Sequence, residues 1–359
     1  MAELTNTDPA GATAHRAAVA AAGRPVIAWL FVCAGMVVLM MLVGAITRLT
    51  ESGLSIAEWN PLIGALPPLT DAEWRRVFDL YRTTSEYRTV NAGMTLEEFR
   101  TIFWWEYLHR LLGRLIGAVF ALPLLWFLLR RRIGGALALR LVAIFLLGGL
   151  QGGIGWWMVK SGLVDRVDVS PYRLAAHLAI AFLILAAILW TALDLLPGPR
   201  VATATPAFLR RGAAALLALI FLMIVSGALV AGLDAGFVYN DWPLMGGVFL
   251  PPEYGTLAPW WLNPFENVAA VQFNHRMLAY GIALAALVLW LAARRSGLAR
   301  PMRRPLDLLL GMVFVQIALG VSALLMHVPL ALGVAHQGGA IAVFCLALWS
   351  VHTLYRQRR

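Results

Sequence analysis

Four histidines lie near one end of long apolar segments, at matching places in the two halves of the sequence: His109, His177, His275 and His336. A polar or ionisable side chain is costly in lipid, so a histidine inside such a segment indicates a function. Neutral imidazole is a good ligand of heme iron, and helix bundles build cofactor sites from side chains on facing helices. The sequence therefore predicts two bis-histidine iron sites. Zinc fits less well, because no cysteine ligand and no HExxH motif accompanies the histidines.

The two halves differ in the residue that precedes the first histidine. Glu106 lies three residues before His109, which places both side chains on one face of a helix. The matching residue before His275 is Gln272, which cannot ionise. A carboxylate beside a metal site can take a proton, stabilise a developing cation or hold a water molecule. We therefore expect the first half to hold the reacting site and the second half to hold a cofactor.

Three arginines follow the histidines closely. Arg110 and Arg114 come after His109, and Arg276 comes directly after His275. A guanidinium group there could bind a heme propionate, or it could extend to the membrane surface. Glu106 could likewise pair with Arg110 instead of taking part in chemistry. The sequence leaves these alternatives open.

The composition is that of a membrane protein. Hydrophobic residues make up 60% of the 359 residues and charged residues only 13%, with a mean hydropathy of +0.75. The net charge of +10 does not indicate a nucleic-acid partner, because the basic residues lie in short runs between apolar segments. The two cysteines, Cys33 and Cys345, lie inside apolar segments and indicate neither a disulfide nor a metal site.

A helix needs about 20 apolar residues to cross the bilayer. Segments of this kind are found at 26–46, 104–128, 140–159, 174–196, 209–231, 268–293, 306–327 and 331–354. Arginines gather before the first span, in alternate connections and after the last span, at positions 16, 24, 130, 131, 132, 140, 200, 210, 211, 294, 295, 300, 303, 304, 356, 358 and 359. By the positive-inside rule both termini are cytoplasmic, and the four histidines lie in the outer half of the membrane.

The sequence also contains an internal repeat. Residues 44–68 align with residues 227–252, so that Gly53 matches Gly236 and Trp59 matches Trp242. The fold class is therefore an all-α integral membrane protein whose spans form two tandem, pseudo-symmetric four-helix bundles with the same orientation.

The expected organisation of the chain follows from these spans. We expect a disordered cytoplasmic tail at 1–25, an N-terminal half at 26–196 with a long outer loop at 47–102, a cytoplasmic linker at 197–208, a C-terminal half at 209–355 and a short tail at 356–359. Within the outer loop, Asp71 and Thr95 mark two helix starts with early acidic residues. We expect short amphipathic helices there, covering the first bundle.

The chain resembles the heme A synthase family. The resemblance rests on TESGLSIAEWNP, GALPP and EYLHRLLGRLIG, together with the spacing of the four histidines, and it extends from about 26 to 355. Some members carry a cysteine pair in the first outer loop. This chain has none there, so it is similar to the cysteine-free branch of alphaproteobacteria and mitochondria.

This resemblance implies an oxidoreductase that oxidises the C8 methyl of heme O to a formyl group by successive hydroxylations, giving heme A for cytochrome c oxidase. It implies that His275 and His336 ligate the cofactor heme b. It also implies that His109 and His177 ligate heme O or heme A, with Glu106 as the catalytic residue. The protein is then expected in the bacterial inner membrane, with its heme sites toward the periplasm and with heme O synthase and oxidase assembly factors as candidate partners.

Two other classes of protein use similar residues. A diheme b-type cytochrome that passes electrons between quinone and a partner needs the four histidines, but it has no need of the difference between Glu106 and Gln272. A transporter built from parallel repeats would use the histidines as a proton relay. It predicts broken helices at the middle of the membrane, which the sequence does not indicate.

Overall fold

The computed structural model describes residues 9–58, 63–164, 168–197 and 205–356. Within these ranges the regular structure is helical, and eight helices are long and apolar enough to cross a membrane. They are α1 (Pro9–Leu49), α4 (Leu96–Leu129), α5 (Gly135–Val164), α6 (Pro171–Leu195), α7 (Ala207–Gly232), α9 (Val268–Arg295), α10 (Arg300–Leu325) and α11 (Leu330–Tyr355). Each predicted span coincides with one of these helices, so the predicted multi-pass, all-α membrane protein is confirmed.

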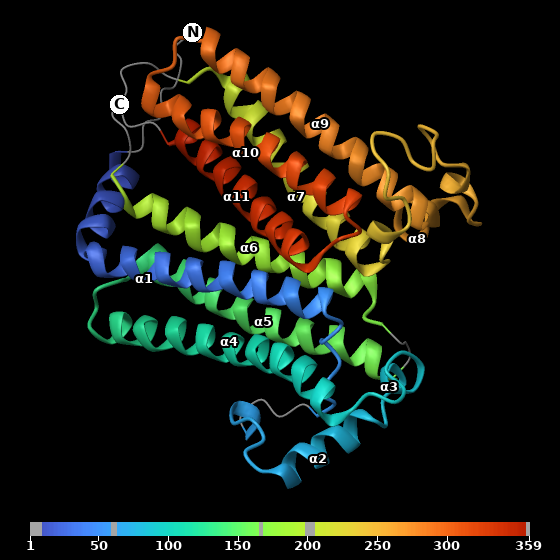
Figure 1. Cartoon of the computed structure of the whole chain (residues 1–359). Coiled ribbons are helices and arrows are strands. Elements are labelled where there is room, and N and C mark those ends of the chain that lie inside the picture. The colour runs from blue at the N-terminus through green and yellow to red at the C-terminus, as the bar shows by residue number, and fades with distance from the viewer. Residues whose placement is uncertain (1–8, 59–62, 165–167, 198–204, 357–359) are drawn as a thin grey trace.

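The long helices run side by side, and the longest loops between them lie at one end of the molecule (Figure 1). We call this the loop end; it carries residues 50–58, 63–95 and 233–267, and the other end is the tail end. Helices α1, α6, α7 and α11 contact one another in the middle of the molecule. Helices α4 and α5 flank this centre on one side, and α9 and α10 flank it on the other (Figure 1).

The beginning of the chain differs from the expectation of a disordered tail. Helix α1 begins at Pro9 and contains a break at Gly23, whose φ of 65° is left-handed. Residues 10–22 are rich in alanine, the residue with the highest helix propensity, which accounts for a helix before the break. Residues 1–8 lie outside the described part, as do Trp59 of the repeat, residues 198–204 of the linker and residues 357–359.

The connection between α1 and α4 contains the first predicted loop helix but not the second. Helix α2 (Asp71–Tyr81) begins at a capping box formed by Thr70 and Glu73. Thr95 forms an equivalent box with Glu98, but it opens the long helix α4 instead of a separate short helix. The correction has a simple cause, because no helix-breaking residue separates Leu96 from the predicted span at 104. A short helix α3 (Ser85–Thr89) and a 3-10 turn η1 (Ile63–Ala65) complete this loop.

The connection between α7 and α9 is built from short turns. These are η2 (Ala235–Phe237), η3 (Pro252–Gly255), η4 (Trp260–Leu262) and α8 (Asn263–Glu266). Asn267 caps α9 through the backbone amide of Ala270, and its side-chain amide also donates to the carbonyl of Glu253 at 2.6 Å. The loop is thereby held against the first turn of α9.

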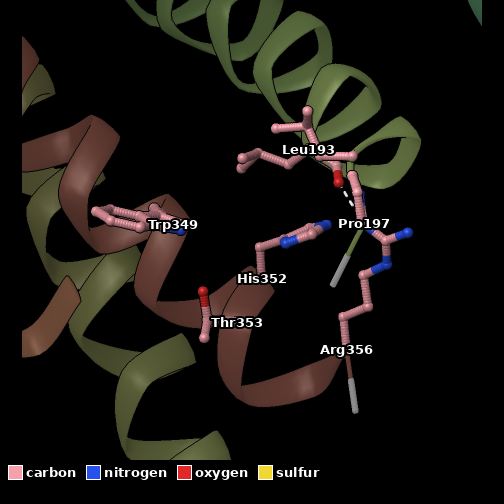
Figure 2. A pocket seen from close by; sticks show the side chains of 7 residues that line it. Leu193, Pro197, Trp349, His352, Thr353 and Arg356 are labelled. Carbon is pink, nitrogen blue, oxygen red and sulfur yellow. Dashed lines mark hydrogen bonds between the residues drawn. The ribbon is translucent and has the colours of Figure 1, made fainter. Parts of the chain in front are cut away.

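The two halves of the chain are joined at both ends of the molecule. At the loop end, Arg48 of α1 forms a 2.8 Å ion pair with Asp234, which follows α7. At the tail end, Asp194 of α6 lies 3.1 Å from His352 of α11. Figure 2 shows a cavity beside this contact, where His352 and Arg356 of α11 face the end of α6. His352 lies about 24 Å along α11 from His336, so this cavity is separate from the predicted iron sites.

Candidate functional site

Each of the four histidine rings packs against a glycine of a neighbouring helix. A Cβ atom added to the glycine would lie within 3.2 Å of the ring carbon Cε1 at every one of these contacts. The contacts and their distances are Gly44 with His109 (3.0 Å), Gly155 with His177 (2.9 Å), Gly227 with His275 (3.2 Å) and Gly320 with His336 (2.8 Å). Any larger residue would displace the ring, so the glycines provide the room in which the imidazoles lie.

The structure brings the histidines together in the predicted pairs. His109 of α4 lies within electrostatic range of His177 of α6, and His275 of α9 lies within electrostatic range of His336 of α11. The Nδ1 atoms of His109 and His177 are buried and have no hydrogen-bond partner among the described residues. In the second half, Nδ1 of His275 lies 3.2 Å from the Ser226 hydroxyl.

Glu106 is held in a buried network at the loop end of α4, and only 3% of it is exposed. One carboxylate oxygen accepts hydrogen bonds from the Ser55 hydroxyl and from the backbone amide of Ile56, both at 2.7 Å. The other oxygen accepts from Arg110, at 3.0 Å from Nε and 2.6 Å from Nη2. The carboxylate therefore acts only as an acceptor, and the loop after α1 is fastened to α4 through it.

Arg110 also binds the backbone of this loop. Its Nη2 donates to the carbonyl of Ile56 at 3.0 Å, and its Nη1 donates to the carbonyl of Glu58 at 3.2 Å. The alternative that Glu106 pairs with Arg110 is thus present in the structure. The pair does not exclude a chemical role for Glu106, because a fixed carboxylate still carries its charge to the site.

The second half repeats this arrangement, in which an arginine of the membrane-spanning helix binds carbonyls of the preceding loop. We call it the loop clamp, and in the second half the neutral Gln272 takes the place of Glu106. Arg276 donates to the carbonyls of Tyr239 at 2.9 Å and Asp241 at 3.0 Å, which match Ile56 and Glu58 when Gly236 is aligned with Gly53. It also donates to the carbonyl of Leu244 at 2.8 Å. In place of the carboxylate, Gln272 donates its amide to the carbonyl of Tyr239 at 3.0 Å and is likewise only 3% exposed.

The hydrogen bonds of Arg110 and Arg276 bear on the prediction that the arginines bind heme propionates. Arg110 and Arg276 use their guanidinium groups on the loop carbonyls, and Arg114 lies half-buried one turn further along α4. A propionate role for the three arginines stays a prediction. What the structure adds is a role that the sequence did not indicate, because Arg110 and Arg276 fasten the loops of the loop end to α4 and α9.

An aromatic cluster covers the loop end of α4 and contains a buried acid. Trp74, Tyr81, Phe99, Phe103 and Tyr107 form this cluster. Glu86 of α3 lies beside it with 5% of its surface exposed, and Tyr81 gives it a side-chain hydrogen bond. Burial raises the pKa of Glu86 to about 8 despite that bond.

Several residues of the site were not found by inspection of the sequence. They are Ser55, which binds Glu106, the glycines at 44, 155, 227 and 320, and Gln151 and Gln316, which contact the second histidine of each half. A signal for some of them existed, since Gly44 and Gly227 occupy the same position in the internal repeat. Glutamine is followed by glycine four residues later at 151–155 and again at 316–320, which is a second sign of duplication.

These features define a class of protein. Among the described residues, no three His, Cys, Asp or Glu side chains lie close enough together to hold a metal ion by themselves. Two imidazoles per half instead suit an iron whose remaining ligands come from a macrocycle. The glycines make room for the rings themselves, and Nδ1 of His109 and of His177 has no hydrogen-bond partner among the described residues. The molecule is a multi-pass membrane protein, and its two histidine pairs would suit the axial positions of heme iron.

Comparison with known proteins identifies the family. The family model for cytochrome oxidase assembly protein, COX15-CtaA, matches residues 27–348, and the chain belongs to this family. It is 52% identical over 336 residues to a protein of Nitrosospira multiformis named heme A synthase, which covers 93% of this chain and 94% of the relative. Proteins with the same name from Rhodospirillum centenum and Parvibaculum lavamentivorans are 53% and 51% identical, covering 93% and 91% of this chain and 90% and 93% of the relatives.

Proposed function

We infer that this chain is a heme A synthase, an oxidoreductase that takes heme O as its substrate and gives heme A as its product. The reaction converts the C8 methyl of the porphyrin into a formyl group by successive hydroxylations. Full-length similarity to proteins of this name supports the inference, as does the membership of a cytochrome oxidase assembly family. The observation that carries it on the structural side is the buried Glu106 beside His109, at the place where the second half has Gln272.

In this proposal the two histidine pairs have different occupants. His275 and His336 hold heme b, and His109 and His177 hold heme O and then heme A. The pairing of the rings and the glycine beside each of them support two histidine sites. The presence of Glu106 in the first half and Gln272 in the second is what supports placing the substrate in the first. Bound heme b supplies one-electron redox chemistry. The protein itself supplies the imidazole ligands, the helix frame that sets their orientation and the loops that cover them.

Glu106 places a negative charge at the reacting half. Its partners Ser55, Ile56 and Arg110 all donate hydrogen bonds to it, so its lone pairs are used and its position is fixed. This geometry favours a role in stabilising positive charge on the substrate over a role as a mobile proton carrier. The neutral Gln272 cannot provide such stabilisation at the second site.

The proposed orientation follows from charge. We place the tail end in the cytoplasm of a bacterial cell, with the protein in the inner membrane as two pseudo-symmetric four-helix bundles. Arginines follow α4 at 130–132, end α9 at 294 and 295, and begin α10 at 300, 303 and 304, and all of these places belong to the tail end. The histidine pairs then lie toward the periplasm. A farnesylated substrate stays in the membrane, which supports a heme O synthase and oxidase assembly factors as partners.

The test is chromatographic identification of the hemes extracted from the purified full-length protein, expressed in cells able to make heme O. Heme B together with heme O or heme A is the expected result. Two molecules of heme B per chain and no other heme would favour a diheme electron carrier. A protein without heme would contradict the ligand assignment of all four histidines.

A further inference from the structure

A glutamine lies beside the second histidine of each half. Nε2 of Gln151 on α5 donates to the backbone carbonyl of His177 at 3.0 Å, and Nε2 of Gln316 on α10 donates to the carbonyl of His336 at 3.0 Å. The same amide nitrogens lie 3.4 Å from ring Nε2 of their histidines. Gln316 is also 3.2 Å from Nδ1 of His336. One backbone hydrogen bond therefore fixes each amide directly beside the imidazole.

Each glutamine works together with the glycine one turn further along its helix. Gly155 and Gly320 follow Gln151 and Gln316 by four residues, so glycine and glutamine lie on the same helix face. The glycine receives the Cε1 edge of the ring, at 2.9 Å for His177 and 2.8 Å for His336 from a would-be Cβ. The amide contacts the ring nitrogens. The ring is thus held at two points by a single neighbouring helix.

The first histidine of each half lacks this arrangement. His109 and His275 meet a glycine of α1 and α7, but no glutamine contacts them among the described residues. The first histidine is instead next in sequence to the arginine of the loop clamp. The two histidines of a pair are therefore held by different means, and the difference is the same in both halves.

We propose that Gln151 and Gln316 are positioning residues that orient the second imidazole of each pair toward the iron it ligates. The proposal rests on the proposed function. An imidazole that binds iron must keep its ring plane and its metal-binding nitrogen in place, and the groups packed around it set both. An iron-bound imidazole offers the Gln amide no acceptor, so the amide acts through its hydrogen bond to the histidine backbone carbonyl and through packing against the ring. Without the amide, the His336 backbone loses this bond to α10. The bond from His336 to heme iron should then break more often.

The second half offers a way to disturb Gln316 without changing it. A Cβ added to Gly339 of α11 would lie only 2.0 Å from Oε1 of Gln316. Gly339 follows His336 by three residues, and the matching residue after His177 is Ile180. The substitution Gly339→Ala must therefore push the Gln316 amide away while both the amide and the histidine remain.

The experiment measures the rate at which carbon monoxide binds to the reduced heme of the full-length protein in detergent. Carbon monoxide can bind only after an axial imidazole leaves, so the rate reports how firmly the ligand is held. All variants carry both His109→Ala and His177→Ala, so that the first half offers no imidazole ligand and the pair in the second half is the one complete pair. We expect Gln316→Leu to bind carbon monoxide about three to tenfold faster, the effect of losing one hydrogen bond, and Gly339→Ala to do the same.

Gln151→Leu in this background is the matched control, because it makes the same change beside the absent ligand. It should leave the rate unchanged. Unaltered rates in Gln316→Leu and Gly339→Ala would overturn the proposal. If Gln316→Leu does not accumulate, Gly339→Ala decides alone, with acceleration supporting the proposal and an unaltered rate overturning it. A parent protein without a six-coordinate heme spectrum would contradict the proposed function itself, which keeps the two failures distinguishable.

Discussion

Both halves of the molecule contain the loop clamp, but the residue that accompanies its arginine is charged in the first half and neutral in the second. In each half an arginine, four residues beyond the acidic or amide residue of its helix, binds two carbonyls of the preceding loop at equivalent positions. The first half adds the carboxylate of Glu106, which accepts from Ser55 and from the Ile56 amide. The second half adds the amide of Gln272, which donates to the Tyr239 carbonyl.

This difference distinguishes what the fold requires from what the reaction requires. Fastening the loop to its helix requires only hydrogen bonds, and both halves achieve it. The carboxylate of Glu106 takes part in the first half, but the second half fastens its loop with the neutral Gln272, so the fold does not require a negative charge at this position. Burying a charge is also costly, so its presence in only one half indicates a function there. The following predictions test that interpretation, beginning with the largest effect.

The substitution Glu106→Gln gives the first half the residue of the second. We expect the variant to keep its hemes, because glutamine has nearly the same shape, but to lose heme A formation by about a hundredfold or more, the range for a lost catalytic carboxylate. The measurement is the ratio of heme A to heme O in extracted hemes. The double variant Glu106→Gln with Gln272→Glu moves the charge to the other half and should be equally inactive. Normal heme A output from Glu106→Gln would remove the carboxylate from the mechanism.

Replacing Arg110 and replacing Arg276 should lower the free energy of unfolding by different amounts, because only Arg110 is paired with a buried carboxylate. Arg110→Leu leaves the Glu106 carboxylate buried without its charged partner, at an expected cost of about 3–5 kcal/mol. Arg276→Leu leaves backbone carbonyls, the Gln272 amide and the partly exposed Asp241 carboxylate, but no buried carboxylate, and should cost about 1–3 kcal/mol. Thermal unfolding of the two variants in detergent provides the comparison. Equal losses of stability would mean that the charge of Glu106 is not what Arg110 balances.

Ser55 supplies a hydrogen bond that the second half lacks, because Val238 stands at the matching position. We expect Ser55→Ala to cost about 1.5–3 kcal/mol, the value of a hydrogen bond to a charged group, and to lower heme A formation severalfold. Val238 is 56% exposed, so the control Val238→Ala should change stability by less than about 0.5 kcal/mol. An inert Ser55→Ala variant would show that the Ile56 amide and Arg110 hold Glu106 without it.

The loops should also differ in their response to pH. Burial raises the pKa of Glu86 from 4.5 to about 8, so the folded loop binds this proton more tightly than the unfolded loop. Its stability is then highest below pH 4.5 and decreases as the pH rises toward 8. We expect limited proteolysis of residues 63–95 to accelerate over this range, and Glu86→Gln to abolish the acceleration.

The loop of the second half is the internal control for this pH effect. Hydrogen bonds from the backbone amides of Gly246 and Gly247 hold the pKa of Asp241 below its usual range, so this carboxylate does not change its charge between pH 5 and 8. Its cleavage should follow only the pH dependence of the protease. An equal change in both loops would contradict a specific role for Glu86.

Much of the fold could be predicted because membrane helices leave local signs. The spans follow from runs of apolar residues, and the helix starts at Asp71 and Leu96 follow from their capping threonines. A capping residue marks where a helix begins but does not indicate how long the helix is. Thr95 marks a real helix start, but it opens the long helix α4, and the alanine-rich residues before Gly23 form a helix where a disordered tail was expected.

The eight spans, the internal repeat, the four histidines and the replacement of Glu106 by Gln272 can be predicted from the chain alone, because they are patterns of residue type. Three other features become visible only in the folded molecule: which glycine receives each ring, which carbonyls the arginines bind, and that Gln151 and Gln316 lie beside histidines of another helix. Such contacts depend on how each helix is rotated and packed against its neighbour. Because the membrane-spanning helices are apolar on nearly every face, the hydropathy pattern does not predict how each helix is rotated.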